Sequence, residues 1–158
     1  ILAECVAMRL REHGFRSRNI SIAVRNVIKY TDGNNRTTTS LDWHSCQHML
    51  GTSTNLAVDI IREAMKLFDE RYARMYPFRG LGISCGTLVP ESVPVQMDLF
   101  GSAEKQARIE QLERNVDILR NRFGNNIVQK GIVLIDRKAA TLDPKADHTI
   151  HPVAMYAM

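Results

Sequence analysis

A short run of amide, acidic and apolar side chains, Gln96-Met97-Asp98-Leu99-Phe100, has the chemistry of a binding peptide. Prolines precede it and Gly101 follows it, which is the composition of a linker. Linkers are usually polar, because their backbone is solvated and they have no face to bury. Leu99 and Phe100 therefore leave apolar area that either their own domain or another surface must cover.

A second candidate is His44-Ser45-Cys46-Gln47-His48, in which metal-ligating side chains alternate along the chain. Structural zinc sites usually combine two separate clusters of paired ligands. The sequence contains no second cluster, so we predict no metal site. We expect the neighbouring Trp43 to pack against a loop rather than to stack on a base.

The residue patterns of phosphoryl-transfer chemistry do not occur in the sequence. Two-metal catalysis requires a cluster of carboxylates held on neighbouring strands, and the P-loop requires a Gly-rich segment followed by Lys. Neither pattern is found. We therefore predict that this chain contains no catalytic residue, binds no cofactor and is not an enzyme by itself.

Composition sets wider bounds on the class of protein. With 158 residues, 44% of them hydrophobic and 24% charged, the chain can hold one globular domain and an appendage. A net charge of +4 is a mild bias towards polyanions. Three widely spaced cysteines, Cys5, Cys46 and Cys85, indicate reduced thiols and a cytoplasmic protein. No apolar run approaches the roughly 18 residues of a membrane helix, and the chain opens within a helix, as a fragment of a longer polypeptide would.

Hydrophobic periodicity predicts the elements that must position these residues. Residues 18–30 alternate, which indicates a strand with one buried face and one polar, basic face. The remaining expected elements are a helix over 1–13 ended by Gly14, a turn at 31–35, a strand at 36–41, an irregular connection at 42–51, a helix at 53–72 and a strand at 78–85.

The order of these elements predicts an α+β fold of the split β-α-β type that lacks its first strand. We expect a mixed sheet that carries two helices on one face and leaves the other face open. Gly80 and Gly82 share one face of the last strand with Ser84. Bare glycines weaken a strand unless something must approach its backbone closely.

A further helix is predicted over residues 102–124, with Ser102 as its N-cap and Gly124 after its end. Its apolar positions lie three and four residues apart and form a narrow seam between Ile109 and Phe123. Such a seam suits docking on the same chain, which we favour, or a short coiled coil. Residues 132–135 could form a short strand, and the tail from Arg137 has no clear periodicity.

Taken together, these segments resemble the C-terminal part of a bacterial Y-family translesion DNA polymerase of the UmuC/DinB type. The resemblance runs from the helix before Gly14 to Phe78-Arg79-Gly80-Leu81-Gly82-Ile83. It implies a little finger domain at 1–91, a linker at 92–101, an accessory helix at 102–124 and a tail of unknown structure at 125–158. Gln96–Phe100 resembles the peptide by which such polymerases bind the β sliding clamp.

The resemblance implies that the open sheet face follows the DNA backbone, through contacts that position the protein without reading sequence. The implied DNA-binding residues are Arg25, Lys29, Arg36, Thr38, Arg79, Gly80, Gly82 and Ser84. The implied clamp-binding residues are Gln96, Met97, Asp98, Leu99 and Phe100. Family members commonly carry a basic residue on the last strand where this chain has Gly82 and Ser84, so backbone amides are expected to replace those charges.

The resulting prediction is a non-catalytic region that binds DNA and recruits the clamp in DNA repair or damage tolerance, as part of the SOS response. The full-length polymerase would hold Mg²⁺ in a palm domain outside this chain. One alternative is a freestanding nucleic-acid-binding or protein-interaction adaptor of similar fold. The expected partners are DNA and the clamp, without a membrane. A homodimer through a sheet edge or the 109–123 seam stays open.

Overall fold

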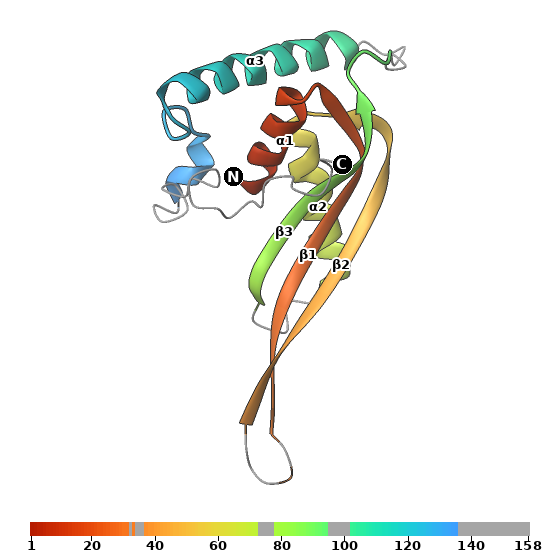
Figure 1. Cartoon of the computed structure of the whole chain (residues 1–158), viewed down its shortest axis with the longest axis vertical. Coiled ribbons are helices and arrows are strands. Elements are labelled where there is room, and N and C mark those ends of the chain that lie inside the picture. The colour runs from red at the N-terminus through yellow and green to blue at the C-terminus, as the bar shows by residue number, and fades with distance from the viewer. Residues whose placement is uncertain (32, 34–36, 73–77, 95–101, 136–158) are drawn as a thin grey trace, which may run out of the picture.

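The computed structural model describes residues 1–31, 33, 37–72, 78–94 and 102–135. Its helices and antiparallel strands form an α+β fold, which confirms the predicted fold class (Figure 1). In chain order they are α1 (Leu2–Glu12), β1 (Phe15–Thr31), β2 (Thr37–Thr54), α2 (Ala57–Arg71), β3 (Phe78–Pro90), α3 (Ser102–Phe123) and the 3₁₀ helix η1 (Gly131–Ile135).

The three described strands form one sheet in the order β2-β1-β3, with β1 in the centre (Figure 1). β1 runs antiparallel to both neighbours. The expectation of a mixed sheet is therefore wrong for the described strands, which contain no parallel pair. β2 and β3 each pair only with β1 among these strands, so each has an outer edge.

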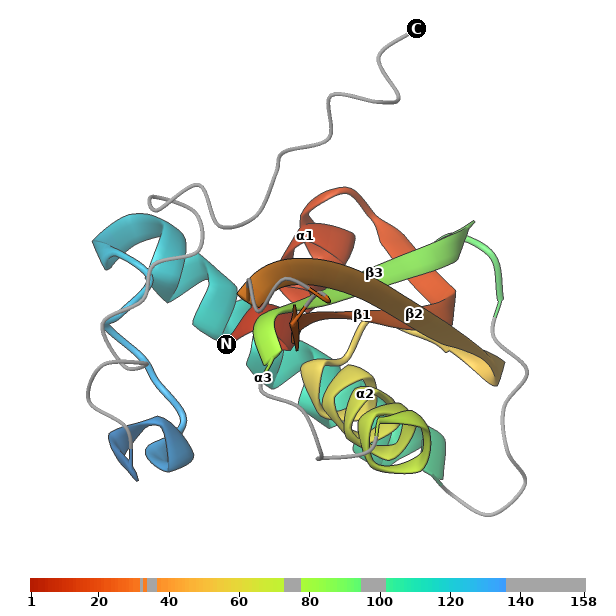
Figure 2. The same ribbon diagram turned by 90° about the horizontal axis from the view of Figure 1, so that it is seen from below.

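The core lies between one face of this sheet and the helices α1 and α2. Ile20, Ile22 and Val24 of β1 have at most 2% of their surface exposed, which confirms the predicted alternation. Ala7 of α1 and Ile60 of α2 are fully buried against this face. Figure 2 shows α2 packed along one side of the strands.

β2 is much longer than the sequence predicted. Residues 42–51 were expected to be irregular, but β2 continues through them to Thr54, which pairs with Ser17 of β1. The prediction fails because His44, Cys46 and His48 occupy the inner face, so apolar and polar residues do not alternate there. Because β2 extends to Thr54, α2 begins at Ala57 rather than at residue 53.

The hairpin of β1 and β2 extends beyond the third strand. β3 pairs with β1 only as far as Asn26, whereas β2 pairs with β1 out to Thr31. The end of the hairpin is therefore a two-stranded ribbon that projects from the body of the domain (Figure 1). Such a ribbon has no third strand and no helix to bury its faces.

Glycines end two helices as predicted. Gly14 follows α1 with φ of +69°, and Gly124 follows α3 with φ of +100°, values that residues with a side chain rarely adopt. The predicted strand at 132–135 is wrong. These residues belong to η1, in which the Val133 amide donates to the Lys130 carbonyl at 2.9 Å.

Candidate nucleic-acid interface

The sheet face opposite the helices is built from the second parity of β1. Each of its residues pairs with one residue of β2 and one of β3, so the register defines rows across the sheet. From the helix end towards the hairpin these rows are Met49–Asn19–Gly86, Gln47–Ser21–Ser84, Ser45–Ala23–Gly82 and Trp43–Arg25–Gly80. We call these four rows the open face. None of its positions is an Asp or a Glu.

The glycines of β3 keep this face flat. A Cβ atom built on Gly82 would lie 3.8 Å from the Cβ of Ala23, and one on Gly80 would lie 3.5 Å from the Cβ of Arg25. These are ordinary van der Waals distances, and neither glycine has a positive φ. Neither packing nor backbone conformation therefore requires glycine here. The result is a low surface onto which another molecule can approach the backbone closely.

Trp43 and Arg25 form the most prominent feature of the open face. The Cζ atom of Arg25 lies 4.7 Å from the centre of the Trp43 ring, a cation–π distance. Trp43 is 56% exposed. The expectation that Trp43 packs against a loop is wrong, because residue 43 lies within β2 and on its open face.

The predicted DNA-binding residues lie in different places. Gly80, Gly82, Ser84 and Arg25 all lie in the rows of the open face. Lys29, which is exposed, has the same parity farther along β1. Arg79 is exposed beside the irregularity between the Arg25–Gly80 and Asn26–Phe78 pairs.

The other two predicted residues belong to the hairpin. Arg36 lies outside the described residues. Thr38 pairs with Tyr30, whereas Lys29 pairs with Thr39. Since partners across a ladder share a face, Thr38 has the register of the opposite face from Lys29. Grouping Thr38 with Lys29 was therefore wrong by one residue, because the hairpin register could not be derived from the sequence.

Sequence reasoning missed the contribution of β2 to the open face. Trp43, Ser45, Gln47 and Met49 all follow the period of two that defines a strand, and each is exposed. Asn19 donates from its side-chain amide to Gln47 at 2.9 Å across the strands. Extending the alternation beyond Leu41 would have placed these side chains on one face.

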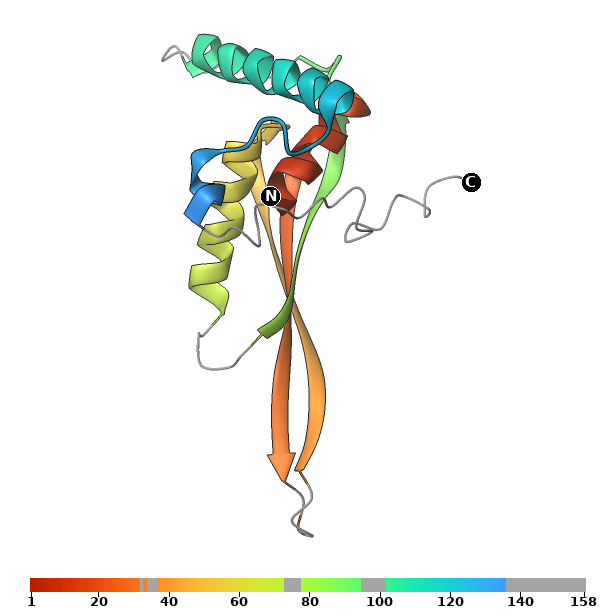
Figure 3. The same cartoon turned by 90° about the vertical axis from the view of Figure 1, so that its left-hand side faces the viewer.

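Acidic side chains gather instead at the other end of the domain, where α3 docks. Figure 3 shows α3 lying across the end of the molecule opposite the hairpin tip. Arg11 of α1 is 7% exposed, and its Nε and Nη2 atoms donate to the two oxygens of Asp117 at 2.7 and 3.0 Å. Glu113 of α3 accepts a further bond from Arg11. This bidentate arrangement ties α3 to the same chain.

Glu113 also caps a second helix. Its two oxygens accept from the amide of Ala57, at the first position of α2, at 3.2 and 3.1 Å. Leu56, the N-cap residue of α2, makes no side-chain capping bond. A carboxylate at this helix end satisfies an open N–H group and opposes the positive end of the helix dipole. The favoured docking of α3 on the same chain is thus confirmed, but charged residues rather than the apolar seam make these contacts.

The apolar seam of α3 is left partly uncovered. Leu112, Leu119 and Phe123 are 63%, 42% and 57% exposed. Ile109, Leu112 and Val116 line a groove of about 470 Å³ that is bounded by Ala57 and Val58 of α2. The polar contacts beside this groove, rather than burial of the seam, hold the helix in place.

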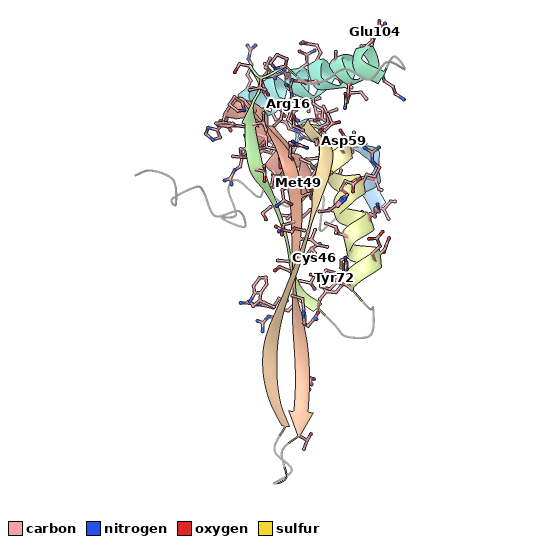
Figure 4. The ribbon with its side chains drawn as sticks, turned by 90° about the vertical axis from the view of Figure 1, so that its right-hand side faces the viewer. Arg16, Cys46, Met49, Asp59, Tyr72 and Glu104 are labelled. Carbon is pink, nitrogen blue, oxygen red and sulfur yellow. The ribbon has the colours of Figure 1, made fainter. Side chains whose placement is uncertain are left out.

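The chain that enters the linker is anchored at Glu91. The Glu91 amide donates to the Gly14 carbonyl at 2.9 Å, and its carboxylate accepts from Arg114 and Asn55, both at 2.7 Å. Figure 4 shows this end of the sheet, with Arg16 close to α3. Residues 96–100 lie outside the described residues, between β3 and α3.

Glu110 of α3 titrates in this cluster. Burial by itself raises the pKa of Glu110. Hydrogen bonds from Arg114 and Asn55, together with the charge of Arg16, outweigh burial and hold the pKa below its ordinary value of 4.5. The docking of α3, which brings Glu110 close to Asn55 and Arg16, therefore favours the charged form of Glu110 over the neutral form.

The alternating histidines and cysteine at 44–48 face the helices rather than each other. Nδ1 of His48 lies 3.1 Å from Glu63 of α2. The Tyr72 hydroxyl donates to the His44 carbonyl at 2.8 Å, and Figure 4 shows Tyr72 beside Cys46. Burial raises the pKa of Tyr72 to about 12. Within the described ranges, no three His, Cys, Asp or Glu side chains are grouped as a metal site would require.

An antiparallel sheet with two helices on one face and an open, carboxylate-free opposite face defines a domain of the little-finger kind. Residues 1–99 match the C-terminal domain of the impB/mucB/samB family, and the chain belongs to this family. The resemblance to the C-terminal part of Y-family polymerases is thereby confirmed.

Curated relatives agree with this assignment. The chain is 33% identical over 133 residues to the DNA polymerase IV of Moorella thermoacetica, across 84% of this chain and 29% of that protein. It is 29% identical over 137 residues to the DNA polymerase IV of Acetivibrio thermocellus, across 87% of this chain and 31% of that protein. The chain thus spans less than a third of the length of these relatives. No helix in its described part is long and apolar enough to cross a membrane.

Proposed function

We propose that this chain is the DNA-binding and clamp-recruiting region of a translesion DNA polymerase that acts in DNA repair or damage tolerance. The observation that carries this proposal is the open face, which is flat, lacks carboxylates and is extended by exposed basic residues. The membership in the impB/mucB/samB family supports a role in translesion synthesis.

The open face suits contact with the DNA backbone. Arg25, Lys29 and Arg79 would neutralise phosphates, and the glycines of β3 would let the strand backbone come close. Such contacts hold the protein on DNA without reading its sequence. The carboxylates around Arg11 lie at the far end of the sheet, where α3 docks, so they do not repel a bound phosphate chain.

DNA titration at several salt concentrations tests this role. The double variant Lys29→Ala/Arg79→Ala is expected to bind duplex DNA more weakly and to lower the slope of log affinity against log salt by about two, since about one unit is lost for each phosphate contact. A matched control is Lys66→Ala/Arg71→Ala, which removes two exposed charges from α2. Equal loss in both variants would show that only net charge matters and would contradict the proposed face.

Clamp recruitment is the second part of the proposed function. Gln96 would place its amide in a polar notch of a β sliding clamp, while Leu99 and Phe100 enter an apolar pocket. Full burial of such side chains contributes roughly 1.5–3 kcal/mol each. In the sequence, the peptide lies between two anchored parts of the chain, the end of β3 at Glu91 and α3 at Asp117, which supports its role as a binding peptide.

A pull-down with purified sliding clamp tests the peptide. Leu99→Ala/Phe100→Ala is expected to abolish clamp association, because the apolar anchors are lost, while circular dichroism stays unchanged. Val93→Ala is the matched control, since Val93 is a 45% exposed apolar residue just outside the peptide. Unchanged clamp binding by the double variant would refute this part of the proposal.

The catalytic activity is assigned to the whole protein. The relatives named DNA polymerase IV suggest that the full-length chain is a DNA polymerase. We propose that it works in the cytoplasm as part of a DNA damage response, with Mg²⁺ bound by carboxylates of a palm domain outside this chain. The present region would then supply affinity and recruitment rather than chemistry.

A further inference from the structure

We infer that Trp43 and Arg25 form a stacking site for an unpaired nucleotide, so that the open face prefers single-stranded DNA to duplex at this position. This inference rests on the proposed binding of DNA to the open face. It specifies which class of nucleic acid binds at one end of that face.

The first argument is the exposure of the indole. A tryptophan in a strand usually covers apolar neighbours, yet Trp43 is 56% exposed and its two row partners are Arg25 and a glycine. Tryptophan is enriched at binding interfaces, because it offers a large apolar ring together with a polar N–H group. An unpaired base offers a flat π face of similar size, and stacking of this kind tolerates any base.

The second argument is the position of the Arg25 guanidinium. It lies over the Trp43 ring at 4.7 Å, which restrains the indole and places a positive charge beside it. The Nε atom of Arg25 is buried and has no hydrogen-bond partner among the described residues. A phosphate next to the stacked base would place an acceptor near this guanidinium.

The surroundings have room for a nucleotide. Gly80 shares the row of Trp43, and the adjacent row towards the helix end, Ser45–Ala23–Gly82, carries only small side chains. Lys29 extends the positive charge along the same parity of β1 towards the hairpin. This arrangement combines an aromatic platform with a basic track, as in proteins that bind single strands.

Duplex DNA does not satisfy the same geometry. In a duplex the faces of the bases are covered by their neighbours, and only edges and backbone reach the surface. The indole of Trp43 would then remain exposed against a groove or a sugar. Only a strand whose bases are unstacked can cover the Trp43 ring face to face.

Intrinsic fluorescence gives a direct test, because Trp43 is the single tryptophan of the chain. The 158-residue chain is titrated with oligothymidylate and, separately, with a blunt duplex of the same length at the same salt. We expect oligothymidylate to quench and shift the Trp43 emission strongly, because a base stacks on the ring, and the duplex to change it much less. Emission that does not respond to oligothymidylate would overturn the inference.

Variants separate stacking from packing. In anisotropy measurements with labelled oligothymidylate, Trp43→Ala is expected to weaken binding by about tenfold, within the range measured for one base–aromatic stack. Trp43→Phe should restore most of this affinity, and Trp43→Leu, which keeps apolar area without an aromatic face, should not. Equal binding by the Leu and Phe variants would exclude a stacking role and overturn the inference.

Duplex binding distinguishes this inference from the proposed function. Trp43→Ala should weaken binding to oligothymidylate much more than binding to the duplex, whereas Lys29→Ala/Arg79→Ala should lower the salt-dependent affinity for the duplex. If duplex binding depends on Lys29 and Arg79 but Trp43→Ala does not affect either ligand, the stacking site is refuted and the proposed DNA-binding face survives. If neither DNA binds, the proposed function fails and the inference fails with it.

Discussion

At the scale of single residues, Arg11 connects two parts of the chain that are distant in sequence. Its acceptor Asp117 lies 106 positions away. Nothing in the pattern around Arg11 separates it from the other arginines of its helix, which the sequence predicts to be polar and solvated. Its burial depends on the placement of α3, and that placement follows no local rule.

Removing the Arg11 side chain should strongly destabilise the domain. Arg11→Leu leaves Asp117 and Glu113 buried or half-buried without their cation, and breaking such a pair costs about 3–5 kcal/mol. The free energy of unfolding in urea measures this loss. The matched control is Arg108→Leu, because Arg108 and Glu104 form an ion pair that is about 80% exposed at both side chains.

Exposed pairs of this kind contribute about 0.3–0.5 kcal/mol in helices. Near-equal effects of the two substitutions would mean that the Arg11 cluster is solvated in solution. A large loss confined to Arg11→Leu would confirm that the buried pair holds α3.

At the scale of elements, the strands show how far the sequence could be read. β1 was predictable because its inner positions are aliphatic and its outer positions are polar, so the period of two is plain. β2 was half missed because His44 and Cys46 face the helices while Trp43 faces outward. In this part of β2 the hydrophobicity of a residue does not indicate whether it faces the core or the solvent. Only the pairing with β1 defines the strand.

The same limit applied to the candidate site. Gly80, Gly82 and Ser84 could be placed on one face from β3 alone, since alternation within a strand is local information. The partners of Arg25 across the sheet could be identified only from the strand register, which the sequence does not provide. For that reason Thr38 was placed one residue out of register. Trp43 was assigned to a loop that does not exist.

β3 offers a test of the flat surface. Gly82→Val should leave the fold intact or stabilise it slightly, because the added Cβ meets ordinary contacts and valine favours strands. The side chain would project from the open face and keep DNA away from the strand backbone, so duplex affinity should fall. Anisotropy titration measures this effect.

Gly82→Lys provides the opposite comparison at the same position. It adds a similar obstruction together with a positive charge, and we expect its duplex affinity to equal or exceed that of the unmodified chain at low salt. A fall as large as that of Gly82→Val would contradict a face that binds phosphates.

At the scale of the whole molecule, the ion pairs that dock α3 and the exposed basic residues beside the open face lie in different parts of the long axis. Paired carboxylates and arginines hold α3 at one end, and the open face with its basic extension occupies the other part of the sheet (Figure 1). The two ends therefore respond to different conditions. Salt should act mainly on DNA binding, whereas acid should act mainly on the docking of α3.

Acid should release α3 before the sheet unfolds. The pKa of Glu110 is lower in the folded chain than its ordinary value of 4.5. Its carboxylate therefore contributes stability above pH 4.5, and this contribution is lost as the pH falls through the lowered pKa. Limited proteolysis with pepsin, which is active in acid, should cut near α3 at a pH at which β1 is still protected.

Glu110→Gln is the matched variant for this experiment. It removes the titrating carboxylate but keeps the shape, so the release of α3 should depend less steeply on pH and should begin from a weaker docked state at neutral pH. An unchanged pH profile would show that other carboxylates of the cluster control the docking.

The central position of β1 has a consequence for tolerated insertions. One face of β1 carries Ile22 into the core and the other presents Arg25 on the open face, while both neighbouring strands take their register from it. One residue inserted into this strand would turn every later side chain of the strand to the opposite face. The apolar core positions and the charged open-face positions would then be exchanged. The register of β1 thus determines both the stability of the domain and the composition of its binding surface, so an insertion in this strand would alter the two together.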